Sequence, residues 1–112
     1  MKHIRVEYPD DTLALADGKI YAKTADGEYS FSVEDVEKAV ILTTDMGPYY
    51  DDMGLAVDVG NEKAIFIMSS HRCYQDFLFE QLGKALPIDF QKIIEASVCI
   101  DNKVFEIYTR QK

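Results

Sequence analysis

The sequence contains no tryptophan, only two cysteines and no long apolar segment. No stretch approaches the ~20 consecutive apolar residues that a membrane-spanning helix needs. Residues 1–7 alternate between polar and apolar side chains and lack the apolar core of a secretory signal. We therefore expect a cytoplasmic protein.

The cysteines, Cys73 and Cys99, lie far apart, and neither belongs to a C-x-x-C pair. This spacing matches no zinc or redox motif. In a cytoplasmic protein such residues are typically reduced and packed in the core. We expect two free, buried thiols and no cofactor.

Basic residues are scarce. The chain has 12 Lys and Arg against 20 Asp and Glu, a net charge of −8, and residues 1–62 alone carry −9. We expect neither nucleic acid nor an anionic membrane as a partner, because a protein needs a basic surface to bind either of them. The acidity indicates either solubility alone or an acidic surface that binds another protein.

The 112 residues, 47% hydrophobic and 29% charged, fit one globular domain spanning residues 1–112. Period-two alternation predicts a series of short strands. Asp17-Gly18, Asp26-Gly27 and Gly60-Asn61 predict tight turns between them. The expected strands are 3–8, 13–16, 20–23, 28–33, 39–44, 55–59, 63–68 and 104–109.

Helical spacing replaces alternation after residue 68. Ser69-Ser70 offers caps for a helix of about 14 residues with apolar positions at Tyr74, Phe77, Leu78, Leu82 and Ala85. Leu86-Pro87 ends that helix. Asp89 is placed to cap a second helix over residues 90–97, with Phe90, Ile93 and Ile94 facing inward. An earlier cap, Ser32 to Asp35, predicts one short helical turn.

These elements predict an α+β domain: an antiparallel β-meander of six or seven strands, two helices and a final strand. The meander, the capped turn before residue 39 and the helix after the last hairpin resemble a pleckstrin-homology-like element order. The analogy concerns fold and implies no function.

Two groups of residues carry a further resemblance. Thr43-Thr44-Asp45-x-Gly47-Pro48 is followed by Asp51-Asp52. Later positions are Leu86-Pro87, Asp89, Ile94, Ala96, Asp101-Asn102 and Phe105. Together they resemble a family of small uncharacterised bacterial proteins over residues 30–110. The chain departs from the family pattern at Gly54, at Leu55 and Tyr108, where tryptophan is usual, and at Ile88. The resemblance implies no activity, cofactor or partner.

The loop between the strands 39–44 and 55–59 is the candidate binding site, with Asp45, Tyr49, Tyr50, Asp51 and Asp52 as its residues. Pro48 fixes a turn there, and the carboxylates could accept backbone N–H bonds within it. The tyrosines and acids could equally form a partner surface. Three aspartates could also bind Mg²⁺ or Ca²⁺, although their spacing matches no calcium loop.

Other candidates have simpler structural explanations. Ser70, His71 and a nearby acid lack the context of a hydrolase nucleophile, so we expect no catalytic residue. His3 lies on the polar face of its strand, where we expect it to be solvated. Cys73 could be activated by a helix N-terminus, but its spacing to Phe77 indicates core packing.

The sequence therefore favours a non-enzymatic protein-binding module that uses the loop and the acidic half of the chain. Edge strands could also pair with a copy of the same chain to form a homodimer. One alternative is an immunity-type inhibitor of a toxin, since acidic inhibitors mask basic nuclease sites. The other is a metal-dependent enzyme using Asp45, Asp51 and Asp52.

Overall fold

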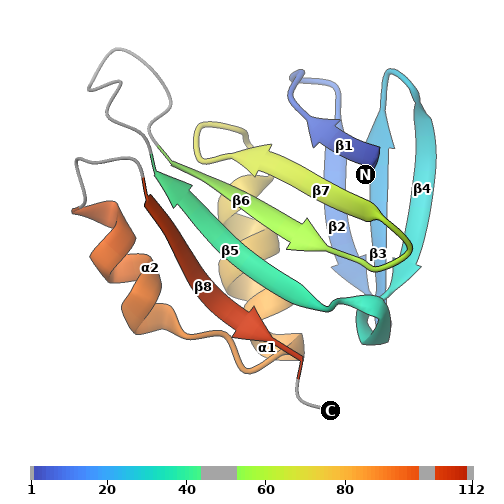
Figure 1. The fold of residues 1–112 in the computed structure, drawn as a ribbon. Coiled ribbons are helices and arrows are strands. Elements are labelled where there is room, and N and C mark those ends of the chain that lie inside the picture. Colours follow the sequence, from blue (N-terminus) through green and yellow to red (C-terminus); the bar gives the residue numbers. More distant parts are fainter. Residues whose placement is uncertain (1, 44–52, 99–102, 111–112) are drawn as a thin grey trace.

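Two β-sheets and helical segments that lie on one side of the larger sheet make up the fold (Figure 1) in a computed structural model that describes residues 2–43, 53–98 and 103–110. The α+β class predicted from the sequence is confirmed. None of the helices in these ranges is long and apolar enough to cross a membrane.

The smaller sheet, sheet B, is an antiparallel meander of β2 (Thr12–Ala16), β3 (Lys19–Thr24) and β4 (Gly27–Ser32). Asp17 and Gly18 join β2 to β3 with φ of 52° and 76°, as a two-residue hairpin turn requires. The second hairpin differs from the prediction. Thr24 pairs with Gly27, so Ala25 and Asp26 form the loop, and Gly27, with φ of 141°, opens β4.

The larger sheet, sheet A, has the order β1-β7-β6-β5-β8. Its strands are β1 (Lys2–Val6), β5 (Lys38–Thr43), β6 (Met53–Asp58), β7 (Lys63–Met68) and β8 (Lys103–Thr109). The prediction of one antiparallel meander is wrong, because β1 leaves the meander and pairs with β7 in parallel. Alternation in residues 2–6 identifies a half-buried strand but does not specify its partner.

Two of the predicted caps, Ser32 and Asp89, are confirmed. The prediction that Ser69-Ser70 caps the first long helix is wrong, because these residues lie in a turn and helical conformation begins only at Tyr74. A short turn, η1 (Val33–Asp35), has a reciprocal capping box between Ser32 and Asp35. Helical conformation then runs through residues 74–85, with a π-wound middle, η2 (Asp76–Leu82), and a final turn, α1 (Gly83–Ala85). The second helix, α2 (Phe90–Ser97), is capped by Asp89, whose carboxylate accepts from the backbone of Gln91 and Lys92.

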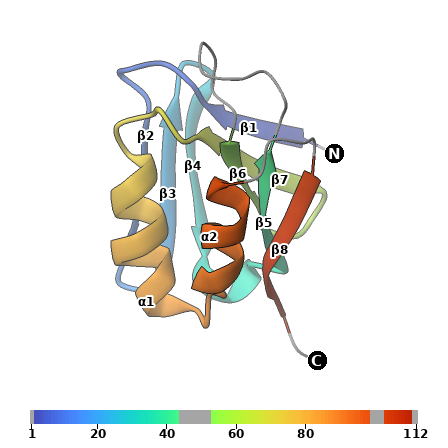
Figure 2. The same cartoon turned by 90° about the vertical axis from the view of Figure 1, so that its left-hand side faces the viewer.

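The core lies between the sheets and the helices. Phe77, Leu78 and Leu82 of η2 are fully buried against apolar side chains of both sheets. The backbone N–H of Leu15 donates to Oε1 of Gln81 at 2.6 Å, which ties η2 to β2. Figure 2 shows the helices together on one side of sheet A.

One predicted strand is too long, and two inward-facing predictions are wrong. The strand predicted over residues 3–8 ends at Val6, so Tyr8 lies beyond the end of β1 and is exposed. In α2 only Ile93 and Ala96 are buried, whereas Phe90 and Ile94 are exposed. The physical reason is that α2 packs against β8 and β5 through one narrow face, while its apolar residues cover a wider arc.

Candidate functional site

The five predicted loop residues, Asp45, Tyr49, Tyr50, Asp51 and Asp52, lie outside the described residues. The strand ends that flank this loop are described. Thr43 pairs with Met53 in β6 and with Lys103 in β8. Its hydroxyl accepts from the backbone N–H of Lys103 at 3.1 Å. The loop therefore starts at the end of sheet A where β8 begins and where α2 ends (Figure 1).

The helical side exposes a row of large apolar side chains close to that end. Phe90 and Ile94 are four residues apart, so they share one side of α2, and Val98, the C-cap residue directly after the helix, is also exposed. Ile94 is 58% exposed and Val98 is 77% exposed. Phe79 of η2 stacks on Phe90, with ring centroids 6.1 Å apart and planes inclined by 18°. We call these four residues the helical patch.

Gly83 explains why Phe90 lies in the patch rather than in the core. A Cβ atom at residue 83 would be 2.6 Å from Cζ of Phe90, so the ring rests directly on the backbone of α1. Phe79 then covers the other part of the ring. The backbone of α1 and a second aromatic ring thus support an exposed surface.

The sequence contained a signal for the helical patch. In residues 90–98 the apolar positions Phe90, Ile93, Ile94, Ala96 and Val98 are too many for one buried stripe. A helix that is apolar over a wide arc must either be surrounded by protein or expose part of that arc. The prediction that Phe90 and Ile94 face inward is wrong because this helix exposes part of its apolar arc.

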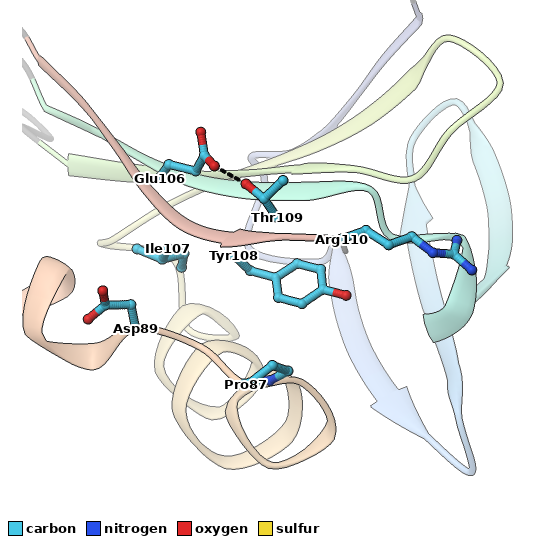
Figure 3. A pocket seen from close by; sticks show the side chains of 7 residues that line it. All are labelled: Pro87, Asp89, Glu106, Ile107, Tyr108, Thr109 and Arg110. Carbon is cyan, nitrogen blue, oxygen red and sulfur yellow. Dashed lines mark hydrogen bonds between the residues drawn. The ribbon is translucent and has the colours of Figure 1, made fainter. Parts of the chain in front are cut away.

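A pocket of about 630 Å³ lies between the α1–α2 connection and β8 (Figure 3). Its charged side chains are already engaged within the chain. The carboxylate of Asp89 caps α2, and that of Glu106 pairs with Lys38 at 3.8 Å and accepts from the hydroxyl of Thr109. Arg110 pairs with Glu37 at 3.7 Å and donates to the carbonyl of Glu34. Each charged side chain that lines the pocket therefore has a structural role within the chain.

His71 and Arg72 hold the turn after β1. Nε2 of His71 lies 2.9 Å from the carbonyl oxygen of Tyr8, and Arg72 donates to the carbonyls of Pro9 and Asp11. The buried carboxylate of Asp11 accepts from the backbone N–H groups of Glu7 and Tyr8. These contacts assign His71 a structural role. The solvated position predicted for His3 is confirmed, since His3 is exposed on β1, and its ring also packs edge-on against Phe66 at 4.9 Å.

The remaining candidates give no chemical site within the described residues. Cys73 is a free, half-buried thiol packed against the core, and Cys99 lies outside the described ranges. The described ranges contain no group of three or more His, Cys, Asp and Glu side chains arranged to hold a metal ion. The metal hypothesis for Asp45, Asp51 and Asp52 therefore stays a prediction.

Within the described residues, the helical patch is an exposed apolar surface. Comparisons with protein-family models, with curated proteins and with solved structures found no match to this chain.

Proposed function

We propose that this protein is a non-enzymatic protein-binding module whose contact surface is the helical patch. The observation that carries the proposal is the exposed set of Phe90 and Ile94 on α2 and Val98 at its C-cap, with Phe79 stacked on Phe90. Contiguous exposed apolar side chains mark interaction surfaces, whereas single ones are ordinary. Aromatic residues are also enriched at the centres of protein interfaces.

The predicted loop belongs to the same proposal. Its flanking residues, Thr43 and Met53, lie at the end of sheet A toward which α2 runs (Figure 1). A partner that covers Val98 would also approach this end. We therefore propose that Asp45, Tyr49, Tyr50, Asp51 and Asp52 form the polar rim of the contact.

The net charge of the chain indicates which class of protein could be the partner. The chain carries −8 overall, and its first 62 residues carry −9. Complementary potentials speed association and disfavour wrong partners. The helical patch lies outside this acidic part, so the charge that bears on the partner is that of Asp45, Asp51 and Asp52 in the proposed rim. The partner that fits is a protein with an apolar ridge and with Lys and Arg side chains on the side that meets the rim. An immunity-type inhibitor bound to a basic toxin is one form of this arrangement, and a toxin-like gene immediately upstream would favour it.

The test is affinity capture from native lysate with the wild type, with Ile94→Glu and with Tyr21→Glu, followed by titration with the purified partner. Tyr21 is a matched control, because it is 47% exposed but lies on β3 of sheet B. We expect Ile94→Glu to weaken binding at least about tenfold, while Tyr21→Glu binds as the wild type does. Equal binding by all three proteins would overturn the proposal.

A charge reversal, Asp51→Lys with Asp52→Lys, tests the loop separately. If the loop forms the rim, the reversal slows association with the purified partner and changes its salt dependence. If Ile94→Glu weakens binding and the charge reversal has no effect, the helical patch alone is the contact surface. Far-UV circular dichroism of each variant controls for folding.

We also retain the pleckstrin-homology-like element order as an interpretation of the scaffold. The three-stranded meander, the capped turn before β5 and the helical segment after the β6–β7 hairpin support it. The parallel pairing of β1 with β7 differs from the arrangement predicted.

A further inference from the structure

The outer face of sheet A, directed away from the helices, is a second surface without a covering element among the described residues (Figures 1 and 2). Strand alternation places buried residues such as Ile4, Ile65 and Ile41 on the inner face. Their sequence neighbours therefore occupy the outer face. This surface is distinct from the helical patch and does not depend on the proposed function.

Two adjacent rows of the outer face are apolar in the middle, whereas the row on their other side, which reads His3, Ala64, Asp58, Lys38 and Thr109, is polar. One transverse row, defined by the strand register, reads Arg5, Phe66, Ala56, Val40 and Glu106 from β1 to β8. The next row reads Met68, Gly54, Leu42 and Val104. The first row thus has a positive charge at one end, Arg5 on β1, and a negative charge at the other, Glu106 on β8. The residues that the two rows have on the central strand β6, Ala56 and Gly54, are small.

The two edges of the outer face also have complementary shapes. A shallow pocket of about 250 Å³ lies on the β1 side of the face, and Phe66 and Met68 form its apolar part beside Arg5 and Glu7. Met68 extends over Gly54, since a Cβ there would be 2.9 Å from its sulfur atom. On the β8 side, Val104 is 64% exposed and projects from the face. One edge therefore carries a pocket and the other an exposed apolar side chain.

We propose that the outer face of sheet A binds the same face of a second copy, around a two-fold axis parallel to β6. This axis exchanges the β1 and β8 edges between the copies. Val104 of each copy then lies over the pocket beside Phe66 and Met68, and Glu106 lies over Arg5. Face-to-face sheets pack about 10 Å apart, within reach of these side chains.

The charges at the two sheet edges favour this axis over its alternative. With this axis, Asp58 of the central strand β6, whose carboxylate accepts from the backbone N–H of Gly60, faces its own copy at one end of the contact. An axis perpendicular to the strands that runs through the first row would place β1 over β1 and β8 over β8, so that Arg5 approaches Arg5 and Glu106 approaches Glu106. In the proposed arrangement the Arg5–Glu7 pair of one copy meets the Lys38–Glu106 pair of the other. Two such clusters flank the apolar middle, in agreement with the polar rim and apolar centre of protein interfaces. The contact is between sheet faces, in contrast to the edge pairing that the sequence suggested.

A charge exchange tests this arrangement. Sedimentation equilibrium should show the wild type as a dimer at about 100 µM. Arg5→Glu and Glu106→Arg should each weaken the dimer about tenfold or more, and the double variant should restore it. Val104→Asp should give a monomer. Ile94→Glu on the helical patch is the matched control and should leave the dimer intact.

Three results with the wild type and the variants of the outer face would overturn the proposal. They are a monomeric wild type at that concentration, a dimer that survives Val104→Asp, and a double variant that dissociates as readily as the single ones. Circular dichroism of the double variant establishes that it is folded, and its composition is identical to that of the wild type. Dissociation by Ile94→Glu would move the dimer contact to the helical patch and overturn this proposal too.

Discussion

The guanidinium Nε of Arg72 lies 2.8 Å from the carbonyl oxygen of Pro9, a contact between residues 63 positions apart in the sequence. A second nitrogen of the same side chain donates to the carbonyl of Asp11 at 3.2 Å. Arg72 thereby joins the segment before η2 to the turn between β1 and β2. This turn is the point at which the chain passes from sheet A to sheet B.

Replacing Arg72 by leucine should lower the free energy of unfolding by about 1 kcal/mol, since two hydrogen bonds from a charged donor are lost at a partly exposed site. Urea denaturation monitored by circular dichroism measures the change. Lys23→Leu is the control, because the Lys23–Glu28 pair is exposed and such pairs contribute little. An Arg72→Leu midpoint equal to that of the wild type would show that the contact does not stabilise the turn.

The ring of His71 should be the Nε2–H tautomer in the neutral form. Nδ1 accepts a hydrogen bond from the backbone N–H of Cys73 at 3.1 Å, so the proton must reside on Nε2, which then donates to the carbonyl of Tyr8. Long-range ¹H–¹⁵N correlation spectra at about pH 8 distinguish the two tautomers. His3 serves as the comparison, because its ring packs against Phe66. A proton found on Nδ1 of His71 would contradict the assigned network.

Elements specified by neighbouring residues were predictable from the sequence. The Asp17-Gly18 turn, the Ser32–Asp35 capping box and the Asp89 cap each satisfy backbone groups within three or four residues. Their formation depends on local sterics and local hydrogen bonds, so the residue types identify them directly.

Contacts between segments that lie far apart in the sequence were not predictable from local residue types. The pattern of Ile4 and Val6 is equally compatible with an antiparallel neighbour in the meander and with the parallel pairing to β7 that occurs. The contact of Arg72 with Pro9 has no sequence signature. The exposure of Ile94 depends on how much of α2 fits against β8 and β5, which the helix sequence does not determine.

Gly83→Ala should destabilise the protein by about 1 kcal/mol, despite a helix-propensity gain of similar size. The new Cβ would lie 2.6 Å from Cζ of Phe90 and 3.0 Å from the carbonyl oxygen of Leu78, and overpacking of this kind is costly. The loss should be smaller in a Phe90→Ala background, which a double-mutant cycle measures by urea denaturation. Equal losses in both backgrounds would show that the Phe90 ring does not rest on Gly83.

Tyr74 should make the stability depend on pH in the alkaline range. Its hydroxyl is buried without a hydrogen-bond partner among the described residues, and burial raises the pKa of Tyr74 to about 12. The ordinary pKa of tyrosine is about 10. Between these values the unfolded chain loses this proton while the folded protein keeps it, so the free energy of unfolding falls as pH rises.

The size of this effect follows from the pKa difference. The Tyr74 contribution should decrease by about 2 to 3 kcal/mol between pH 10 and pH 12 and remain constant below pH 10. Tyr74→Phe removes the titrating group and the unpaired hydroxyl. The variant should therefore equal the wild type near neutral pH, or exceed its stability by up to about 1 kcal/mol. Its advantage should then grow above pH 10, as urea denaturation at about pH 8 and pH 11 would measure. A stability difference between the two proteins that is the same at both pH values would show that the Tyr74 hydroxyl ionises equally readily in the folded and unfolded chains.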